Sequence, residues 1–238
     1  KQDHFRYEAM RIVDVAMMGN REVWEAMAEK EKSFRNVARE YIEAGLWAVA
    51  LTFVLRAFVI QAFRIPSESM VPTLLKGDFL FVDKFEYGPK IPFTHVRLPG
   101  IRPPRRGDVI VFQYPRNPRQ DFIKRCIAVG GETIEIHNKQ VIVNGDTLNE
   151  PYSIRTDPST RPPGFEPRDN FGPYTRAKGE LFMKGDNRNN SNDSRFWGPV
   201  KMDLVKGRAM FIYFSTDGNN PLEAFGKIRV GRLFRPIR

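Results

Sequence analysis

Residues 106–129 have the sequence RGDVIVFQYPRNPRQDFIKRCIAV. This stretch contains two short runs of β-branched and aromatic residues, Asp108–Tyr114 and Phe122–Val129, on either side of two prolines. Runs of this kind, bounded by turn-forming residues, are typical of β-strands. The stretch therefore predicts that the part of the chain around it forms a β-sheet.

Similar runs follow one another on both sides of this stretch. They are Phe79–Phe85, Thr133–Ile136, Val141–Val143, Leu181–Met183 and Arg208–Phe214. Residues 86–106 and 150–180 are instead rich in Pro, Gly and Arg and show little periodicity, which predicts long loops and, for 150–180, a lid-like insertion. We expect a mainly β domain over residues 64–238.

The composition of the 238 residues excludes several classes of protein. Hydrophobic residues make up 41% and aromatic residues 12%, which excludes a disordered or collagen-like chain. The single cysteine, Cys126, excludes an internal disulfide framework and a multi-cysteine zinc site. The three histidines, His4, His95 and His137, are too far apart in sequence to indicate a metal site. We expect no metal and no cofactor.

The formal net charge of +10 leaves two kinds of partner open, nucleic acid and an anionic membrane surface. Residues 1–40 contain eight basic and eight acidic side chains, so the whole excess lies in residues 41–238. The first 43 residues predict a helical segment of two short amphipathic helices, with a break at Gly19-Asn20.

Residues 44–63, AGLWAVALTFVLRAFVIQAF, predict a membrane-spanning helix. Twenty residues at a rise of about 1.5 Å each cross a hydrocarbon core about 30 Å thick. The one charge, Arg56, lies toward the end of the segment, where its side chain can reach the interface. A cleaved secretory signal does not fit, since some forty charge-rich residues precede the segment.

Basic residues are more frequent before residues 44–63 than after them, with Lys30, Lys32, Arg35 and Arg39 upstream and Arg64 and Lys76 downstream. This bias predicts a single-pass protein of the inner (plasma) membrane, with a cytoplasmic N-terminus and an extracytoplasmic β domain. Such a placement argues against nucleic acid as a partner.

Three short segments carry candidate chemistry. The first, residues 65–74 (IPSESMVPTL), places Ser67 and Ser69 in a loop stiffened by two prolines, which can present a hydroxyl group at a fixed position. Taken alone, a serine in such a loop is more often an ordinary turn residue.

The second segment, residues 122–132 (FIKRCIAVGGE), places Lys124 inside an apolar strand-like run. Strand alternation puts Lys124 and Arg125 on opposite faces, so one can face inward while the other meets solvent. Burial lowers the pKa of a lysine and makes its neutral amine available as a base, although a basic pair on a surface strand is the commoner structure.

The third segment, residues 185–195 (GDNRNNSNDSR), is dense in short polar side chains. It could be a simple polar turn, and its acidic spacing does not fit an EF-hand calcium loop.

Together, these segments resemble the bacterial type I signal peptidases, which are membrane-bound Ser/Lys endopeptidases that remove signal peptides from exported preproteins. The resemblance covers about residues 44–215 and includes PSESMVPTL, GDFLFVDKF, RGDVIVF, KRCIAVGGE and GDNRNNSNDSRFWGPV in the order of that family. It implies a signal-peptidase-like β catalytic domain with an inserted β/loop subdomain, preceded by the transmembrane helix.

The resemblance also implies a role for individual residues. Ser69 matches the nucleophile and Lys124 the general base, while Ser67 matches the residue that forms the oxyanion hole with the Ser69 N–H. Ser191 matches the hydroxyl that orients the lysine. Asp193 and Arg195 match a supporting ion pair. Asp186 and Arg188 are further supporting residues of the same loop. Met70 is a candidate substrate contact. The implied substrates are exported preproteins with small residues one and three positions before the cut.

Two other classes remain as alternatives. A soluble Ser/Lys self-cleaving repressor would need a DNA-binding helix pair at its N-terminus. A non-catalytic membrane-anchored β protein that binds anionic lipid or nucleic acid would not need Ser69, Lys124 and Ser191 together. Membrane phospholipid is a further expected partner, through two basic groups: Arg97, Arg102, Arg105, Arg106, Arg116 and Arg119, and Lys227, Arg229, Arg232, Arg235 and Arg238.

Overall fold

The computed structural model describes residues 34–91, 94, 96–217 and 227–238, together with Met17, Met27, Glu29, Lys30 and Lys32. The chain divides into two compact units, Lys1–Phe53 and Val54–Arg238. We call the second the β unit. Most of the expected N-terminal amphipathic helices, including the break at Gly19-Asn20, falls outside the described residues.

One helix, Phe34–Val59, is long and apolar enough to cross a membrane, and it is the only such helix in the described part of the chain. Its last turn is the π-helical η1 (Leu55–Val59). The helix starts earlier and ends sooner than the expected segment 44–63. Residues 60–63 are instead part of a strand, because every residue from Ile60 to Arg64 pairs with the neighbouring strand.

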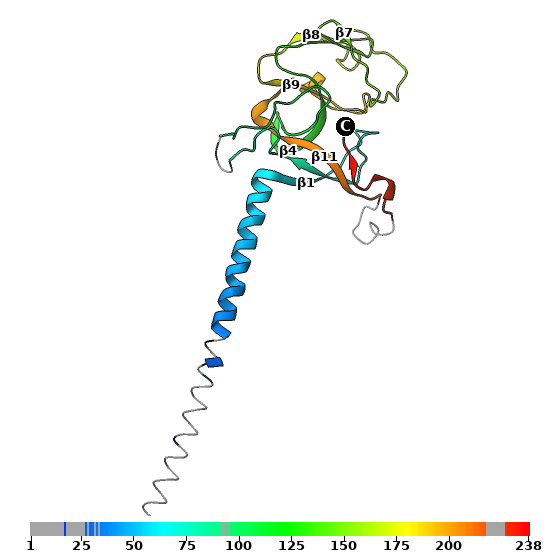
Figure 1. The fold of residues 1–238 in the computed structure, drawn as a ribbon. Helices are drawn as coiled ribbons and strands as arrows, with labels where there is room; N and C mark the ends of the chain where they lie inside the picture. Colours follow the sequence, from blue (N-terminus) through cyan, green and yellow to red (C-terminus); the bar gives the residue numbers. More distant parts are fainter. Residues whose placement is uncertain are drawn as a thin grey trace, which may run out of the picture. The chain divides into compact units, whose positions relative to one another are not determined.

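The β unit is built around one large antiparallel sheet in the order β1-β2-β11-β3-β4-β9-β10, with β12 also paired to β11 (Figure 1). Its strands are β1 (Ile60–Arg64), β2 (Asp78–Asp83), β3 (Val109–Tyr114), β4 (Asn117–Ala128), β9 (Glu180–Lys184), β10 (Val200–Lys201), β11 (Val205–Ser215) and β12 (Arg235–Pro236). Besides η1, the described part of this unit contains the short helices α2 (Ser194–Trp197), η2 (Met202–Leu204) and η3 (Val230–Arg232). The mainly β fold predicted from the sequence is confirmed.

Two apolar clusters hold the large sheet together. One contains Ile65, Met70, Leu74, Leu80 and Ile212, each at most 2% exposed. The other lies around Phe112, Cys126, Met183 and Trp197. The first cluster joins the β1–β2 connection to the sheet, so the loop that carries Ser69 is fixed by packing at both ends.

A second antiparallel sheet, in the order β7-β6-β5-β8, is inserted between β4 and β9 (Figure 1). Its strands are β5 (Thr133–His137), β6 (Gln140–Val143), β7 (Asp146–Thr147) and β8 (Phe171–Thr175). The runs Thr133–Ile136 and Val141–Val143, predicted as strands, therefore belong to the insertion, which begins before the expected boundary at residue 150 and also includes the loop of residues 150–170.

Candidate active site

Ser69 lies in the connection between β1 and β2. This connection closes on itself: Ile65 N–H donates to the Asp78 carbonyl at 2.8 Å, and Leu74 N–H donates to the Met70 carbonyl at 2.9 Å. The Ser69 side chain is 8% exposed. The loop therefore presents its hydroxyl from a fixed, nearly buried position.

Lys124 comes from the middle of β4 and meets this hydroxyl. Its Nζ donates to Ser69 Oγ at 2.5 Å, and the lysine is 5% exposed. Burial lowers the pKa of Lys124 to about 8, although the Asp193 and Asp186 carboxylates favour its charged form. A nucleophile in contact with an amine that loses its proton near neutral pH is the arrangement expected of a Ser/Lys pair.

Arg125, the next residue of β4, does not meet solvent as the alternation of the strand suggested. It is 1% exposed, and its guanidinium binds both oxygens of Asp186, at 2.9 and 2.8 Å. The group also stacks on the Tyr152 ring, with the Arg125 Cζ 4.0 Å from the ring centroid. Both faces of β4 are covered here, so a basic pair that looks solvent-facing in sequence is buried on both sides.

Ser67 lies two residues before the expected nucleophile, and its hydroxyl is 3.4 Å from Ser69 Oγ. The residue is exposed on the wall of the cavity. Among the described residues, no group accepts a hydrogen bond from the Ser69 N–H. Apart from the contact between the two hydroxyls, neither Ser67 Oγ nor the Ser69 N–H has a hydrogen-bond partner among the residues described.

The loop of residues 185–195 braces the Ser69 loop from behind. Asn187 N–H donates to the Ser69 carbonyl at 3.1 Å, and its side-chain amide donates to the Glu68 carbonyl at 3.2 Å. Thr73 Oγ donates to Asp186 at 2.6 Å. Asn187 and Thr73 were not singled out from the sequence, because nothing in the local pattern shows which distant backbone they bind.

Asp193 and Arg195 form the ion pair expected of them, with Nε and Nη2 of Arg195 at 2.7 and 2.8 Å from the two carboxylate oxygens. Burial alone would raise the pKa of Asp193, but Arg195 outweighs it and holds the pKa at about 2. Arg188 pairs with Glu150 through two hydrogen bonds of 2.6 Å. This pair ties the loop to the insertion.

Ser191 lies in the same loop and is 8% exposed, but its hydroxyl has no hydrogen-bond partner in the described part of the chain. The expected bond from Ser191 to Lys124 is therefore not formed in this structure. Ser191 remains close to the reacting groups, because a Cβ added to Gly185 would lie 2.3 Å from Ser191 Oγ and 2.4 Å from the Ser69 carbonyl oxygen.

Met70 does not line the cavity at Ser69, contrary to the expectation that it contacts substrate. It is 1% exposed and packs with Ile65, Leu74 and Leu80 in the core. The tight turn after Ser69 points the thioether side chain inward, where it anchors the loop.

A cavity of about 520 Å³ opens beside the Ser69–Lys124 pair. Its lining residues are Pro66, Ser67, Glu68, Ser69, Lys76, Asp121, Phe122, Ile123, Lys124, Asn190 and Asn192. Four of these are consecutive residues of β4, and the pairing of β4 with β9 begins only at Arg125. The edge of β4 before Arg125 is thus open to an extended peptide.

No group of three or more His, Cys, Asp or Glu side chains that could hold a metal ion occurs among the residues described. The cavity offers a hydroxyl, an amine and strand-edge amides. Cys126, beside Arg125 on β4, is fully buried, and burial raises the pKa of its thiol to about 12, so it takes no part in the chemistry.

Comparison with known proteins identifies the family. The family model described as "Signal peptidase, peptidase S26" matches residues 38–214. A signal peptidase I of Pseudomonas aeruginosa is 35% identical over 68% of this chain and 64% of its own length, just under two thirds. A signal peptidase I of Aquifex aeolicus is 32% identical over 84% of this chain and 98% of its own.

Two further matches have the same description. A probable signal peptidase I-1 of Synechocystis is 36% identical over 79% of this chain and 88% of its own. Among solved structures, a signal peptidase I of Enterococcus faecalis V583 is 32% identical, covering 45% of this chain and 97% of that one, with a TM-score of 0.37.

The chain therefore belongs to the signal peptidase family, peptidase S26, and is a peptidase. The family resemblance seen in the sequence is confirmed. The apolar helix Phe34–Val59 is compatible with a membrane anchor in such a protein.

Proposed function

We propose that this protein is a membrane-anchored serine endopeptidase that cleaves signal peptides from exported preproteins with a Ser69/Lys124 dyad. The observation that carries the proposal is the 2.5 Å contact between Lys124 Nζ and Ser69 Oγ at the wall of an open cavity. The lowered pKa of Lys124 supports it, since a base must be neutral to accept a proton.

In the proposed reaction, neutral Lys124 takes the proton of Ser69 as Oγ attacks the scissile carbonyl carbon. The resulting ammonium then gives a proton to the leaving amine, and an acyl-enzyme remains on Ser69. In the second half, Lys124 takes a proton from a water that attacks the ester carbonyl, and the ammonium returns this proton to Ser69 Oγ as the acyl bond breaks. One amine thus serves as base and acid in turn.

The oxyanion that forms in both halves is stabilised by Ser67 Oγ and the Ser69 N–H. Both donors are available at the cavity, as described above. Preorganised donors of this kind act without reorganising when charge develops. Asn187 keeps the Ser69 N–H in place, because its side-chain amide donates to the Glu68 carbonyl, which belongs to the same planar peptide group as that N–H.

The supporting residues act on the shape of the loop. Asp193 accepts hydrogen bonds from the Gly185 N–H at 3.1 Å and from Arg195. Asp186 accepts from Arg125, the residue after Lys124 on β4, and so fixes this part of the strand. We assign Ser191 to orienting Lys124 when substrate is bound, since its buried hydroxyl is otherwise unsatisfied.

The substrate lies along the open edge of β4 at Asp121–Lys124 as an added strand. Successive side chains of such a strand alternate in direction, so the residues one and three positions before the cut face the same wall of the cavity. That wall admits small residues of the Ala-x-Ala kind.

The helix Phe34–Val59 anchors the enzyme as a single membrane pass, with the N-terminus cytoplasmic and the β unit outside. Exposed basic residues of the β unit, among them Arg105, Arg119 and Arg235, then contact anionic phospholipid. This location leaves no role for nucleic acid.

The test uses detergent-solubilised full-length protein and a preprotein with an Ala-x-Ala site. We expect cleavage by the natural sequence and none by Ser69→Ala or Lys124→Met. Cleavage that survives either substitution contradicts the dyad. Cleavage of its own chain alone would favour the self-cleaving class, and no cleavage of any substrate would favour a binding protein.

A further inference from the structure

Another, much smaller cavity is lined by residues of the insertion, of the end of β9 and of the loop of residues 185–195. It has room for about one water-sized sphere, with a volume of about 10 Å³. Six of its eight lining residues are basic and only one is acidic: Lys139, Arg155, Arg168, Asp169, Lys184, Arg188, Asn189 and Arg195.

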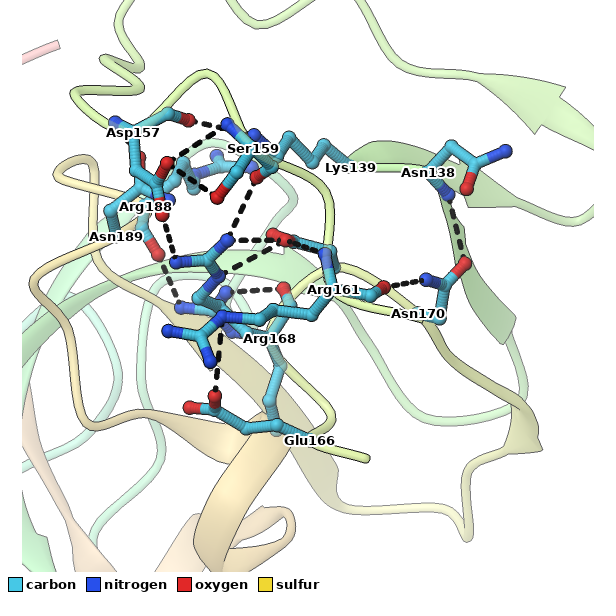
Figure 2. A network of polar contacts seen from close by, with 12 residues as sticks. Asn138, Lys139, Asp157, Ser159, Arg161, Glu166, Arg168, Asn170, Arg188 and Asn189 are labelled. Atoms are coloured by element: carbon cyan, nitrogen blue, oxygen red, sulfur yellow. Dashed lines mark hydrogen bonds and ion pairs between the residues drawn. The ribbon is translucent and has the colours of Figure 1, made fainter. Parts of the chain in front are cut away.

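All four lining arginines already have carboxylate partners, including Arg155, whose Nη2 lies 3.5 Å from Glu150 Oε2. Arg168 donates to Asp169 and Asp157, each at 2.6 Å, within the network shown in Figure 2. Arg188 and Arg195 pair with carboxylates that do not line the cavity, as described above. Lys139 donates to the Asp157 carbonyl at 2.7 Å. Each of these five basic residues thus has a carboxylate partner or a hydrogen-bond acceptor.

Lys184, at the end of β9, is different. It is 2% exposed, and its Nζ has no hydrogen bond or ion pair with any described residue. Burial lowers the pKa of Lys184 well below 10.5 and the nearby Arg188 and Arg195 lower it further, while the Glu150 and Asp193 carboxylates oppose this shift. Arg188 Nε is a second buried donor without a partner at the same place. Donors without acceptors are costly when buried, so Lys184 Nζ and Arg188 Nε lack an acceptor of their own in this cavity.

We propose that this cavity binds one halide ion, chloride under physiological conditions, with the Lys184 ammonium group as its charge partner. A cation is disfavoured beside the Lys184 ammonium and the unpartnered Arg188 Nε–H, and a single-atom anion needs the least space in so small a cavity. A water molecule would supply an acceptor but would not stabilise the ammonium form.

The ion would join the insertion to the loop that braces the dyad. Arg188, Asn189 and Arg195 belong to the same loop as Asn187, which holds the Ser69 carbonyl. Halide binding therefore stabilises the folded β unit and the loop behind Ser69 together. The inference does not rest on the peptidase activity, because it concerns stability.

The first experiment measures thermal unfolding of the full-length protein in detergent, in sodium chloride, bromide or gluconate at equal ionic strength. We expect a saturable rise in melting temperature with the two halides, by about 3–6 °C at ten times the dissociation constant, and none with gluconate. Coinciding chloride and gluconate curves would overturn the proposal.

A matched pair of variants locates the effect. Lys184→Met removes the ammonium with little change in volume and should abolish the difference between halide and gluconate. Lys178→Met removes an exposed lysine of the turn before β9 and should leave the difference between halide and gluconate unchanged. A halide effect that survives Lys184→Met contradicts the assignment.

A second measurement keeps the proposal testable if Lys184→Met does not fold. Crystals of the natural sequence grown in bromide should show an anomalous peak between Lys184 and Arg188. Density in the cavity without an anomalous signal would identify a water molecule and overturn the proposal.

Discussion

At the scale of single residues, the proposed reaction depends on the protonation of Lys124. Its pKa of about 8 leaves about a tenth of the amine neutral at pH 7. Because the neutral form is the base, we expect kcat/KM for a blocked peptide to rise with pH through an apparent pKa near 8 and then to level off. The measurement is a pH–rate profile from pH 6 to 10. A flat profile, or one that falls over pH 6–8, would remove Lys124 from the role of base.

Ser67 carries a second prediction at this scale. Its hydroxyl lies beside Ser69 Oγ and is expected to bind the oxyanion only as charge develops. Ser67→Ala should therefore lower kcat by about 100- to 1000-fold with KM nearly unchanged. Ser159→Ala, in the loop of the insertion, serves as the control and should leave kcat unaltered. If Ser67→Ala raised KM with kcat unchanged, Ser67 would instead contribute to ground-state binding.

Single residues also show which features of the site the sequence predicts and which it does not. Ser69 and Lys124 are 55 positions apart, yet the motifs that contain them predicted a pair, and the structure brings the two together. The environment of Arg125 and the inward position of Met70 were not predicted. Both depend on which distant elements cover a given face, and alternation along a strand carries no information about that.

At the scale of elements, the turn after β9 controls the fit between two loops. A Cβ added to Gly185 would lie 2.3 Å from Ser191 Oγ and 2.4 Å from the Ser69 carbonyl oxygen. The latter is backbone, so Gly185→Ala must displace the nucleophile loop. A shift of about 1 Å costs on the order of 100-fold in rate, and we expect a loss of kcat of at least that size.

The control for this prediction is Gly231→Ala, since nothing lies within 4 Å of a Cβ at Gly231. It should keep both kcat and melting temperature. Gly185→Ala with normal kcat would mean that the two loops can separate without affecting Ser69.

Two element boundaries differ from those predicted, and for one physical reason. Residues 60–63 continue the apolar run of the helix before them, and hydropathy alone cannot distinguish a helix from an apolar strand there. Pairing with β2 decides the outcome. The second boundary is the start of the insertion. It lies before residue 150, because β5 pairs with β6 and β8, and β6 pairs with β7.

At the scale of the whole molecule, the net charge of +10 is not all available to a membrane. Arg97 donates to the Gly88, Met202 and Val205 carbonyls, and Arg232 is buried against Asp78. Arg102 is paired with Asp108. These three cannot serve the lipid contact expected of them, because internal acceptors already occupy their guanidinium groups. The proposed lipid surface is therefore smaller than the sequence suggests.

The last prediction concerns the helix as a tether. If Phe34–Val59 holds the β unit at the bilayer, an inserted preprotein meets Ser69 at a high effective concentration. Removing residues 1–53, the first compact unit, should lower kcat/KM for a vesicle-inserted preprotein by about 100- to 10,000-fold. The same variant should cleave a short soluble peptide within about threefold of the full chain, because the dyad and its bracing loop lie in the β unit. Both rates are measured with equal amounts of enzyme. An equal loss on both substrates would mean that the helix is needed for folding, and no loss on either would mean that tethering does not limit the reaction.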